Sequence, residues 1–178
     1  MMTRSRMALA VLVAAMVFSH LKAEGTYYMS LGLLPVRYME FPSPDADVRV
    51  MRLNLTAGCH RSMYGLDLGT IGNWTSENMG GVIIAGGYNV AQHECYGLQL
   101  SCVNFTGDAH YGLQTGICNL TWGIRGFQLG LVNVTSDGAG LQIGVYNVAE
   151  DFSGFQLGLI NMNMASPLMM MPFVNIWF

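Results

Sequence analysis

The stretch GFQLGLVNVT at residues 126–135 is one copy of a repeat that organises most of this 178-residue chain. Related copies read GLQLSCVNFT at 97–106, GLQTGICNLT at 112–121, GLQIGVYNVA at 140–149 and GFQLGLINMN at 154–163. Successive copies begin 15, 14, 14 and 14 residues apart. A repeat this regular is interpreted before any other pattern, because it decides the architecture of the whole chain.

Each copy alternates with a period of two. In the copy at 126–135, Phe127, Leu129 and Leu131 fall on one face, whereas Gln128 falls on the other. A period of two is typical of a β-strand and not of a helix. Short polar stretches between the copies are typical of turns. Each repeat therefore predicts one strand followed by one turn.

The spacing also permits neighbouring copies to pair as antiparallel hairpins. If Asn119 lies opposite Phe127, then Gln114 lies opposite Val132, so that like faces meet. Two strands before the repeats and one at the C-terminus extend the pattern. The sequence thus predicts an all-β fold, an antiparallel meander of about ten strands at 26–38, 48–56, 63–73, 81–91, 95–106, 110–121, 124–135, 138–149, 152–163 and 169–178.

Closure of this meander removes its two unpaired edges. Strands of nine to eleven residues, an even strand number and a terminal aromatic residue favour a small outer-membrane-type β-barrel, with Phe178 as the membrane-assembly signal. The uniform repeat spacing favours the alternative, a β-solenoid in which each copy forms one coil. A soluble β-sandwich is the third architecture.

Amide side chains recur at two positions of the repeat. In a solenoid they would stack into hydrogen-bonded ladders, and in a meander they would bond across strands. These repeat-ladder residues are Gln99, Gln114, Gln128, Gln142, Gln156, Asn104, Asn119, Asn133, Asn147 and Asn161.

The N-terminus is typical of an export signal. Two arginines precede an uninterrupted apolar run at 7–18, and the small residue Ala23 follows as a cleavage site. The chain is therefore divided into a signal peptide, 1–23, and a single repeat-built β domain, 24–178. Only 11% of its residues are charged and 52% are hydrophobic, which excludes a disordered chain. After cleavage, five arginines and eleven acidic residues leave a net charge of −6, which excludes a basic nucleic-acid-binding surface.

Candidate reactive residues are few. Cys59 and Cys95 are predicted to lie at the same end of the meander, and an exported chain can oxidise them to a disulfide. Buried free thiols are the alternative. His60, His93 and Glu94 near these cysteines are zinc-type ligands, but their spacing matches no metal motif. The sequence contains no nucleophile motif, phosphate loop or acid pair, so we expect no catalytic, metal or cofactor site and no enzymatic activity.

The repeat copies, the YGLDLG stretch at 64–69 and the terminal PFVNIWF resemble the bacterial surface-repeat proteins first described in leptospires. The resemblance covers residues 47–178, and the chain departs from the repeat at Ser101 and Thr115. It implies export and an outer-membrane or cell-surface location. It implies no catalytic residue.

These patterns lead to three functional hypotheses. The first is an exported bacterial outer-membrane or surface protein with a structural or surface-interaction role, in contact with outer-membrane lipid. The second is a soluble or surface-attached β-solenoid that acts as an adhesion or binding module. The third is a small membrane-barrel enzyme, which requires a polar cluster at one rim. Only His60, His93 and Glu94 suggest such a cluster, and the sequence does not specify a surface partner.

Overall fold

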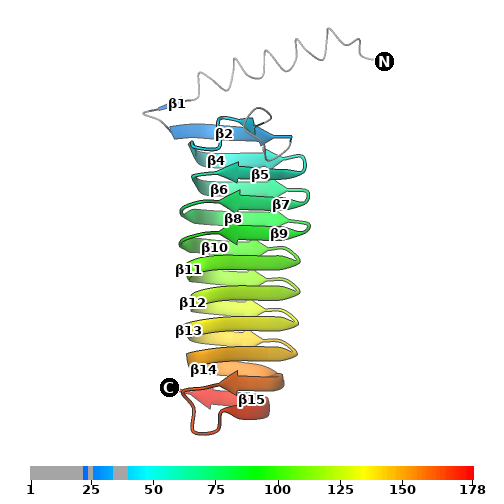
Figure 1. Ribbon diagram of the computed structural model, residues 1–178, viewed down its shortest axis with the longest axis vertical. Coiled ribbons are helices and arrows are strands. Elements are labelled where there is room, and N and C mark those ends of the chain that lie inside the picture. The colour runs from blue at the N-terminus through cyan, green and yellow to red at the C-terminus, as the bar shows by residue number, and fades with distance from the viewer. Residues whose placement is uncertain (1–21, 24–25, 34–39) are drawn as a thin grey trace, which may run out of the picture.

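The computed structural model describes residues 22–23, 26–33 and 40–178 of the chain. The regular structure of these residues consists of β-strands that wind round one axis. Each coil stacks on the one before it, from β2 at the top of Figure 1 to β15 at the bottom. The predicted signal peptide falls mostly in residues 1–21, outside the described residues.

Within the described part of the chain, no helix has the length and apolar character needed to cross a membrane.

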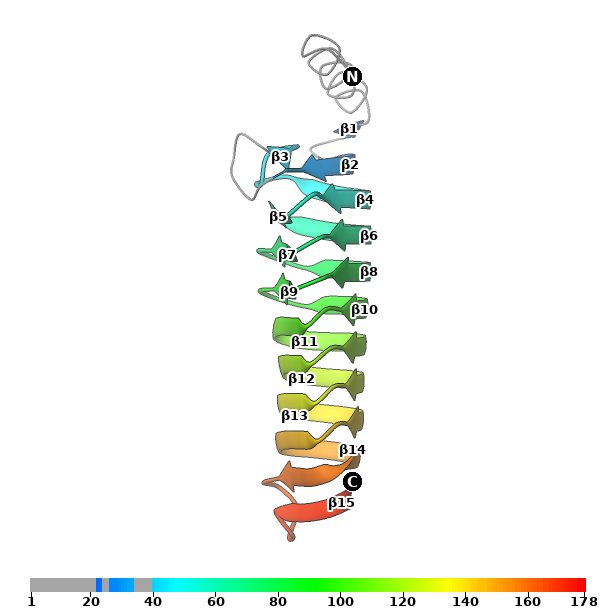
Figure 2. The ribbon, with the colours of Figure 1, turned by 90° about the vertical axis from the view of Figure 1, so that its right-hand side faces the viewer.

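Each coil contributes a strand to a wide sheet and a shorter strand to a narrow sheet. Figure 2 shows β5, β7 and β9 of the narrow sheet set apart from β4, β6 and β8 of the wide sheet. The separate wide-sheet strands are β2 (Thr26–Gly32), β4 (Asp47–Asn54), β6 (Ser62–Gly69), β8 (Met79–Ala85) and β10 (Cys95–Leu100). The separate narrow-sheet strands are β5 (Ala57–His60), β7 (Gly72–Thr75) and β9 (Tyr88–Ala91).

In the later coils a single strand runs from the narrow sheet into the wide sheet, and its pairing is interrupted only at the passage between the sheets, as between Thr106 and Ala109 of β11. Both sheets continue there as parallel ladders. These continuous strands are β11 (Val103–Thr115), β12 (Cys118–Leu129), β13 (Val132–Ile143) and β14 (Tyr146–Asn163).

Antiparallel strands lie at both ends of the parallel stack. β15 (Met170–Trp177) pairs antiparallel with β14 and follows the last coil. β1 (Lys22–Ala23) and β3 (Glu40–Phe41) both pair antiparallel with β2. The change of direction at β15 ends the parallel series.

The predicted antiparallel barrel is wrong, and the β-solenoid is the architecture observed. Asn119 lies beside Asn133 in a parallel ladder, and not opposite Phe127 as the hairpin prediction required. Gln114 lies beside Gln128 in the same way. The prediction of an all-β, repeat-built chain is confirmed. Each repeat, however, crosses both sheets, as two separate strands in the earlier coils and as one strand that continues from the narrow into the wide sheet in the later ones, because a coil must cross both sheets before it returns to the same position.

The first glycine of the repeat has a positive φ within the wide-sheet strands. A Cβ atom at Gly126 would lie 2.1 Å from the carbonyl oxygen of Gly112 in the preceding coil. The positive φ at this position is one that L-residues rarely adopt, so both the dihedral angle and the available space favour glycine. The glycines of this column are Gly65, Gly81, Gly97, Gly112, Gly126, Gly140 and Gly154.

Candidate functional site

An asparagine ladder runs through the interior along the axis. Asn133 donates from Nδ2 to Asn147 Oδ1 at 2.8 Å and to the carbonyl of Ile143 at 2.9 Å, and its own Oδ1 accepts from Asn119 at 2.8 Å. Each rung donates to the next coil in this way, over 2.7–3.1 Å. The ladder comprises Asn54, Asn73, Asn89, Asn104, Asn119, Asn133, Asn147 and Asn161.

The ladder begins earlier than the predicted residues, in the weak repeat copies. Gly58 occupies the register position of an asparagine, beside Asn73. The side chain of Asn54 fills that space from the preceding strand, and a Cβ at Gly58 would lie 2.0 Å from Asn54 Oδ1. The second glycine of the repeat, such as Gly130, likewise leaves space for an asparagine side chain of the ladder. Ser101 replaces this glycine in one copy, and its hydroxyl donates a hydrogen bond to Asn104 Oδ1 at 2.9 Å.

A glutamine ladder lies parallel to the first, inside the wide sheet. Gln128 donates from Nε2 to Gln114 Oε1 at 2.8 Å, toward the preceding coil, so this ladder runs opposite to the asparagine ladder. Its members are at most 1% exposed. They are Gln99, Gln114, Gln128, Gln142 and Gln156. The structure thus places all ten predicted repeat-ladder residues in two buried ladders.

Near the N-terminal end, an ion pair takes the place of the glutamines. Arg52 and Asp67 occupy successive positions of the glutamine column, and both are fully buried. Arg52 Nε donates to Asp67 Oδ1 at 2.7 Å, Nη2 donates to Oδ2, and Nη1 donates to the carbonyl of Trp74 at 3.2 Å. Burial raises the pKa of the Asp67 carboxyl, against the opposing effect of the Arg52 guanidinium.

Sequence reasoning missed this ion pair. The 15-residue separation of the two residues, one repeat length, is the signal that connects them.

His60 packs against this ion pair in the interior. Its Nε2 lies 3.1 Å from Ser30 Oγ and 3.3 Å from the carbonyl oxygen of Pro42, and its Nδ1 lies 3.4 Å from Arg52 Nη1. Burial and the positive charge of Arg52 lower the pKa of His60 to about 3. Because His60 is fully buried and Ser30 is 2% exposed, this pair has no access to a substrate and acts as polar packing.

The cluster suggested by His60, His93 and Glu94 is not formed. His93 lies on the outside, where its Nδ1 is 2.8 Å from Asp108 Oδ2 and both side chains are more than half exposed. Across the described residues, no group of three or more His, Cys, Asp or Glu side chains is arranged to hold a metal ion.

The predicted disulfide between Cys59 and Cys95 is absent from the structure. Cys95 is a free thiol, fully buried at the start of β10 in the wide sheet. Cys59 lies in the narrow sheet beside Trp74, two residues into β5. The meander placed both cysteines at one end of a barrel, but the coils assign them to different sheets. Burial raises the pKa of the Cys95 thiol.

The terminal aromatic residue packs on the outer face of the last coils. The ring of Phe178 meets that of Phe155 edge-on, with centroids 5.7 Å apart. Phe178 follows the antiparallel strand β15. Its predicted role as a barrel-assembly signal loses its basis, because the strands do not close into a barrel.

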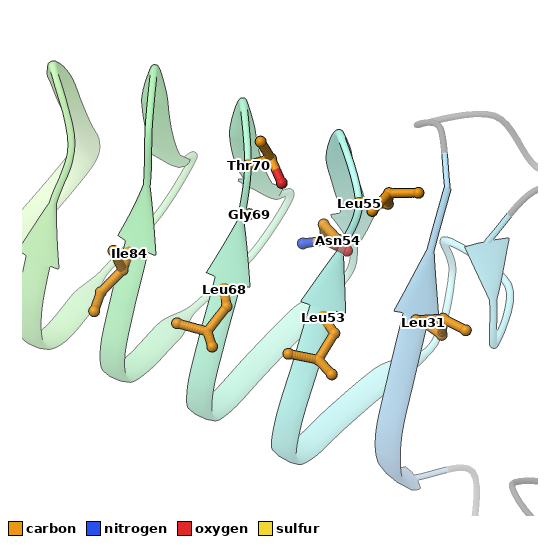
Figure 3. Close-up of a pocket in the computed structure, with 8 residues that line it drawn as sticks. All are labelled: Leu31, Leu53, Asn54, Leu55, Leu68, Gly69, Thr70 and Ile84. Atoms are coloured by element: carbon orange, nitrogen blue, oxygen red, sulfur yellow. The ribbon is translucent and has the colours of Figure 1, made fainter.

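The outward side of the wide sheet is apolar along its length. Figure 3 shows Leu31, Leu53, Leu68 and Ile84 on successive strands, lining a shallow hollow. At about 4.8 Å per strand, nine neighbouring strands extend this surface over roughly 40 Å. We name it the wide face; its two central columns are Met29, Met51, Leu66, Val82, Leu98, Leu113, Phe127, Leu141 and Phe155, and Leu31, Leu53, Leu68, Ile84, Leu100, Thr115, Leu129, Ile143 and Leu157.

The outward side of the narrow sheet has the same character. We name it the narrow face; its central column is Cys59, Trp74, Val90, Phe105, Leu120, Val134 and Val148. The molecule therefore places most of its polar amides inside and many of its aliphatic and aromatic side chains outside, partly the reverse of an ordinary soluble domain. Apolar side chains such as Met79, Ile124 and Phe152 are nevertheless buried between the sheets. Contiguous exposed apolar surface of this extent is typical of an interaction site.

The arrangement offers apolar contact on two faces and keeps most of its polar groups in internal hydrogen bonds. Comparison of the chain with models of protein families, with curated proteins and with solved structures finds no match.

Proposed function

We propose that this chain is an exported, non-enzymatic repeat protein that acts at the outer membrane or surface of a bacterium as an interaction module. The observation that carries the proposal is the partly reversed distribution of polarity. Two amide ladders hold the interior together, and the wide and narrow faces present apolar side chains outward. Such faces are stable in an exported protein when lipid or another apolar surface covers them.

The basic and apolar N-terminus supports export. Among the alternatives, the solenoid fold favours a surface-attached binding module over a barrel enzyme. The buried histidines support a non-catalytic role, because burial lowers the pKa of His110 to about 4 as well. A general base that works near neutral pH needs a pKa close to that pH and access to substrate.

Fractionation of a Gram-negative host that produces the full chain tests the proposal. We expect the chain in the envelope fraction, and we expect mass spectrometry to show cleavage after Ala23. The chain should also be accessible to protease added to intact cells or to cells with opened outer membranes. The variant Leu12→Arg interrupts the apolar run at 7–18 and is the matched control, expected to stay uncleaved in the cytoplasm. If the wild-type chain stays uncleaved in the cytoplasm, the proposal is refuted.

A further inference from the structure

The chain passes between the two sheets at two rims that differ in charge. We name the turns from narrow to wide sheet the charged rim and those from wide to narrow sheet the neutral rim. From residue 53 onward, Asp67 is buried, and the other charged side chains lie at or beside the charged rim. These are Arg61, Glu77, Glu94, Asp108, Arg125, Asp137, Glu150 and Asp151.

The neutral rim is uncharged and apolar at its tip. Ile71, Ile117, Leu131 and Leu159 stand at equivalent turn positions and are between 51% and 59% exposed. In each coil after residue 52, one segment runs from the wide-face column that contains Leu53 and Leu68, through the neutral rim, to the end of the narrow strand. None of these segments contains Asp, Glu, Lys or Arg. These segments are 53–60, 68–75, 84–91, 100–106, 115–121, 129–135, 143–149 and 157–163.

Backbone groups at the neutral rim bond from coil to coil. Leu131 N–H donates to the carbonyl of Ile117 at 3.0 Å, and Val145 N–H donates to that of Leu131 at 2.9 Å. The ladder residue Asn133 donates its second N–H to the carbonyl of Ile143, at the end of the wide strand. The N–H groups of these turns therefore have internal partners, which hydrocarbon requires of backbone polar groups.

A column of tyrosines and arginines separates the charged rim from the aliphatic part of the wide face. Tyr96 and Tyr111 stack with ring centroids 5.0 Å apart, and the Tyr96 hydroxyl donates to Glu94 at the charged rim. Amphipathic aromatic rings of this kind are typical of a membrane–water interface. The same column contains Arg49, Tyr64 and Arg125, and its other positions are the small residues Gly80, Ala139 and Ser153.

The depth of the apolar part corresponds to one leaflet. From Tyr96 to the neutral-rim turn at Ser101 the strand advances five residues, about 16 Å at ~3.3 Å per residue. Half of a hydrocarbon core of ~30 Å is about 15 Å.

We propose that the solenoid inserts edgewise into one leaflet of a lipid bilayer, neutral rim first, with its axis parallel to the membrane plane. Lipid chains then cover both faces and the neutral rim, while the charged rim stays in water. A second copy stacked on the wide face would leave the neutral rim and the narrow face exposed, so lipid accounts for more of the surface. This inference rests on the proposed surface role and names the partner as lipid hydrocarbon.

The first test is flotation of the purified full chain with vesicles. One set is made of dioleoylphosphatidylcholine alone, and the other contains 30% dioleoylphosphatidylglycerol. Leu131→Glu adds a charge at the neutral rim, and Ser136→Glu adds one five residues later at the charged rim. We expect Leu131→Glu to weaken partitioning by about tenfold and Ser136→Glu by less than about twofold. The acidic rim predicts no gain from the anionic lipid.

The second test locates the two rims. A polarity-sensitive fluorophore is attached at Leu131→Cys or Ser136→Cys in a background without Cys59, Cys102 and Cys118. We expect a blue shift and quenching by acyl-chain nitroxide lipids at position 131, and neither at position 136. Residues 1–23 are present in both variants, so they cannot create this difference. Circular dichroism establishes that each variant retains the wild-type strand content.

Equal emission and quenching at both positions overturns edgewise insertion. A blue shift at position 131 without vesicles, together with a dimeric mass, shows that a second copy of the chain covers the neutral rim. That result also overturns edgewise insertion. Either result leaves the envelope fractionation unchanged, so failure of this inference is distinguishable from failure of the proposed function.

Discussion

Replacement of Gly126 by alanine is expected to unfold part of the solenoid, whereas replacement of Gly123 in the same strand is expected to be harmless. A Cβ at Gly126 would lie 2.1 Å from the carbonyl oxygen of Gly112, and φ at Gly126 is 148°. At Gly123 the nearest atom to an added Cβ is that of Ala109, at 3.5 Å, an ordinary contact. The two glycines are three residues apart, so they form a matched pair.

The size of the effect follows from two contributions. An L-residue held at such a φ costs about 1–3 kcal/mol, and opening the coil contact to admit a methyl group costs about 1–3 kcal/mol more. We therefore expect Gly126→Ala to lower the free energy of unfolding by roughly 4 kcal/mol. Gly123→Ala is expected to raise it by up to about 1 kcal/mol, because alanine reduces the conformational entropy of the unfolded chain.

Urea unfolding followed by circular dichroism measures both variants. With a slope of about 2 kcal/mol per molar urea, the midpoint of Gly126→Ala falls by roughly 2 M. Midpoints of the two variants within about 0.3 M of each other refute the steric argument. That result means that the coils separate locally and accept a side chain at position 126.

Three further perturbations address the interior. Asn133→Ala removes three hydrogen bonds from the asparagine ladder and is expected to cost roughly 3–5 kcal/mol, read from the same urea midpoints. Asp67→Asn leaves the buried Arg52 charge unpaired and should cost about 3–5 kcal/mol, whereas the double variant Arg52→Met, Asp67→Leu should recover most of that loss, a comparison made by thermal unfolding. Because burial lowers the pKa values of His60 and His110 to about 3 and about 4, the unfolded chain gains protons below about pH 6.5 that the folded chain does not. Stability should therefore fall with decreasing pH by about 1.4 kcal/mol per pH unit for each histidine, and His110→Gln should remove one share of this slope in urea titrations between about pH 6 and pH 4.5.

The repeat and the alternation of faces were readable from the sequence, and the path of the chain was not. The spacing of Gln114, Gln128 and the matching asparagines is equal for a hairpin series and for a stack of coils. What separates the two is the passage from one sheet to the other inside each repeat, between Thr121 and Gly123 in β12, which leaves like residues of successive copies paired in parallel. Assigning one strand to each repeat therefore led to the barrel prediction.

The interior at the N-terminal end was the other omission. Arg52 and Asp67 stand one repeat apart, yet each looks like an ordinary surface residue when its strand is considered alone. The disulfide prediction failed for the same reason, because the position of Cys95 depends on which sheet its strand joins. The register between successive coils, and not the sequence pattern within one strand, determines which residues lie beside Arg52 and Cys95.

The opposed directions of the two amide ladders have a consequence for the length of the molecule. Asn119 donates toward the next coil, whereas Gln128 donates toward the preceding one. Aligned peptide dipoles add up along a helix and leave partial charges at its ends. Here the two rows of amide dipoles oppose each other, so an added coil contributes little net moment. Duplication of a coil therefore lengthens the stack without accumulating an electrostatic penalty, and the end of growth is left to the antiparallel strand β15.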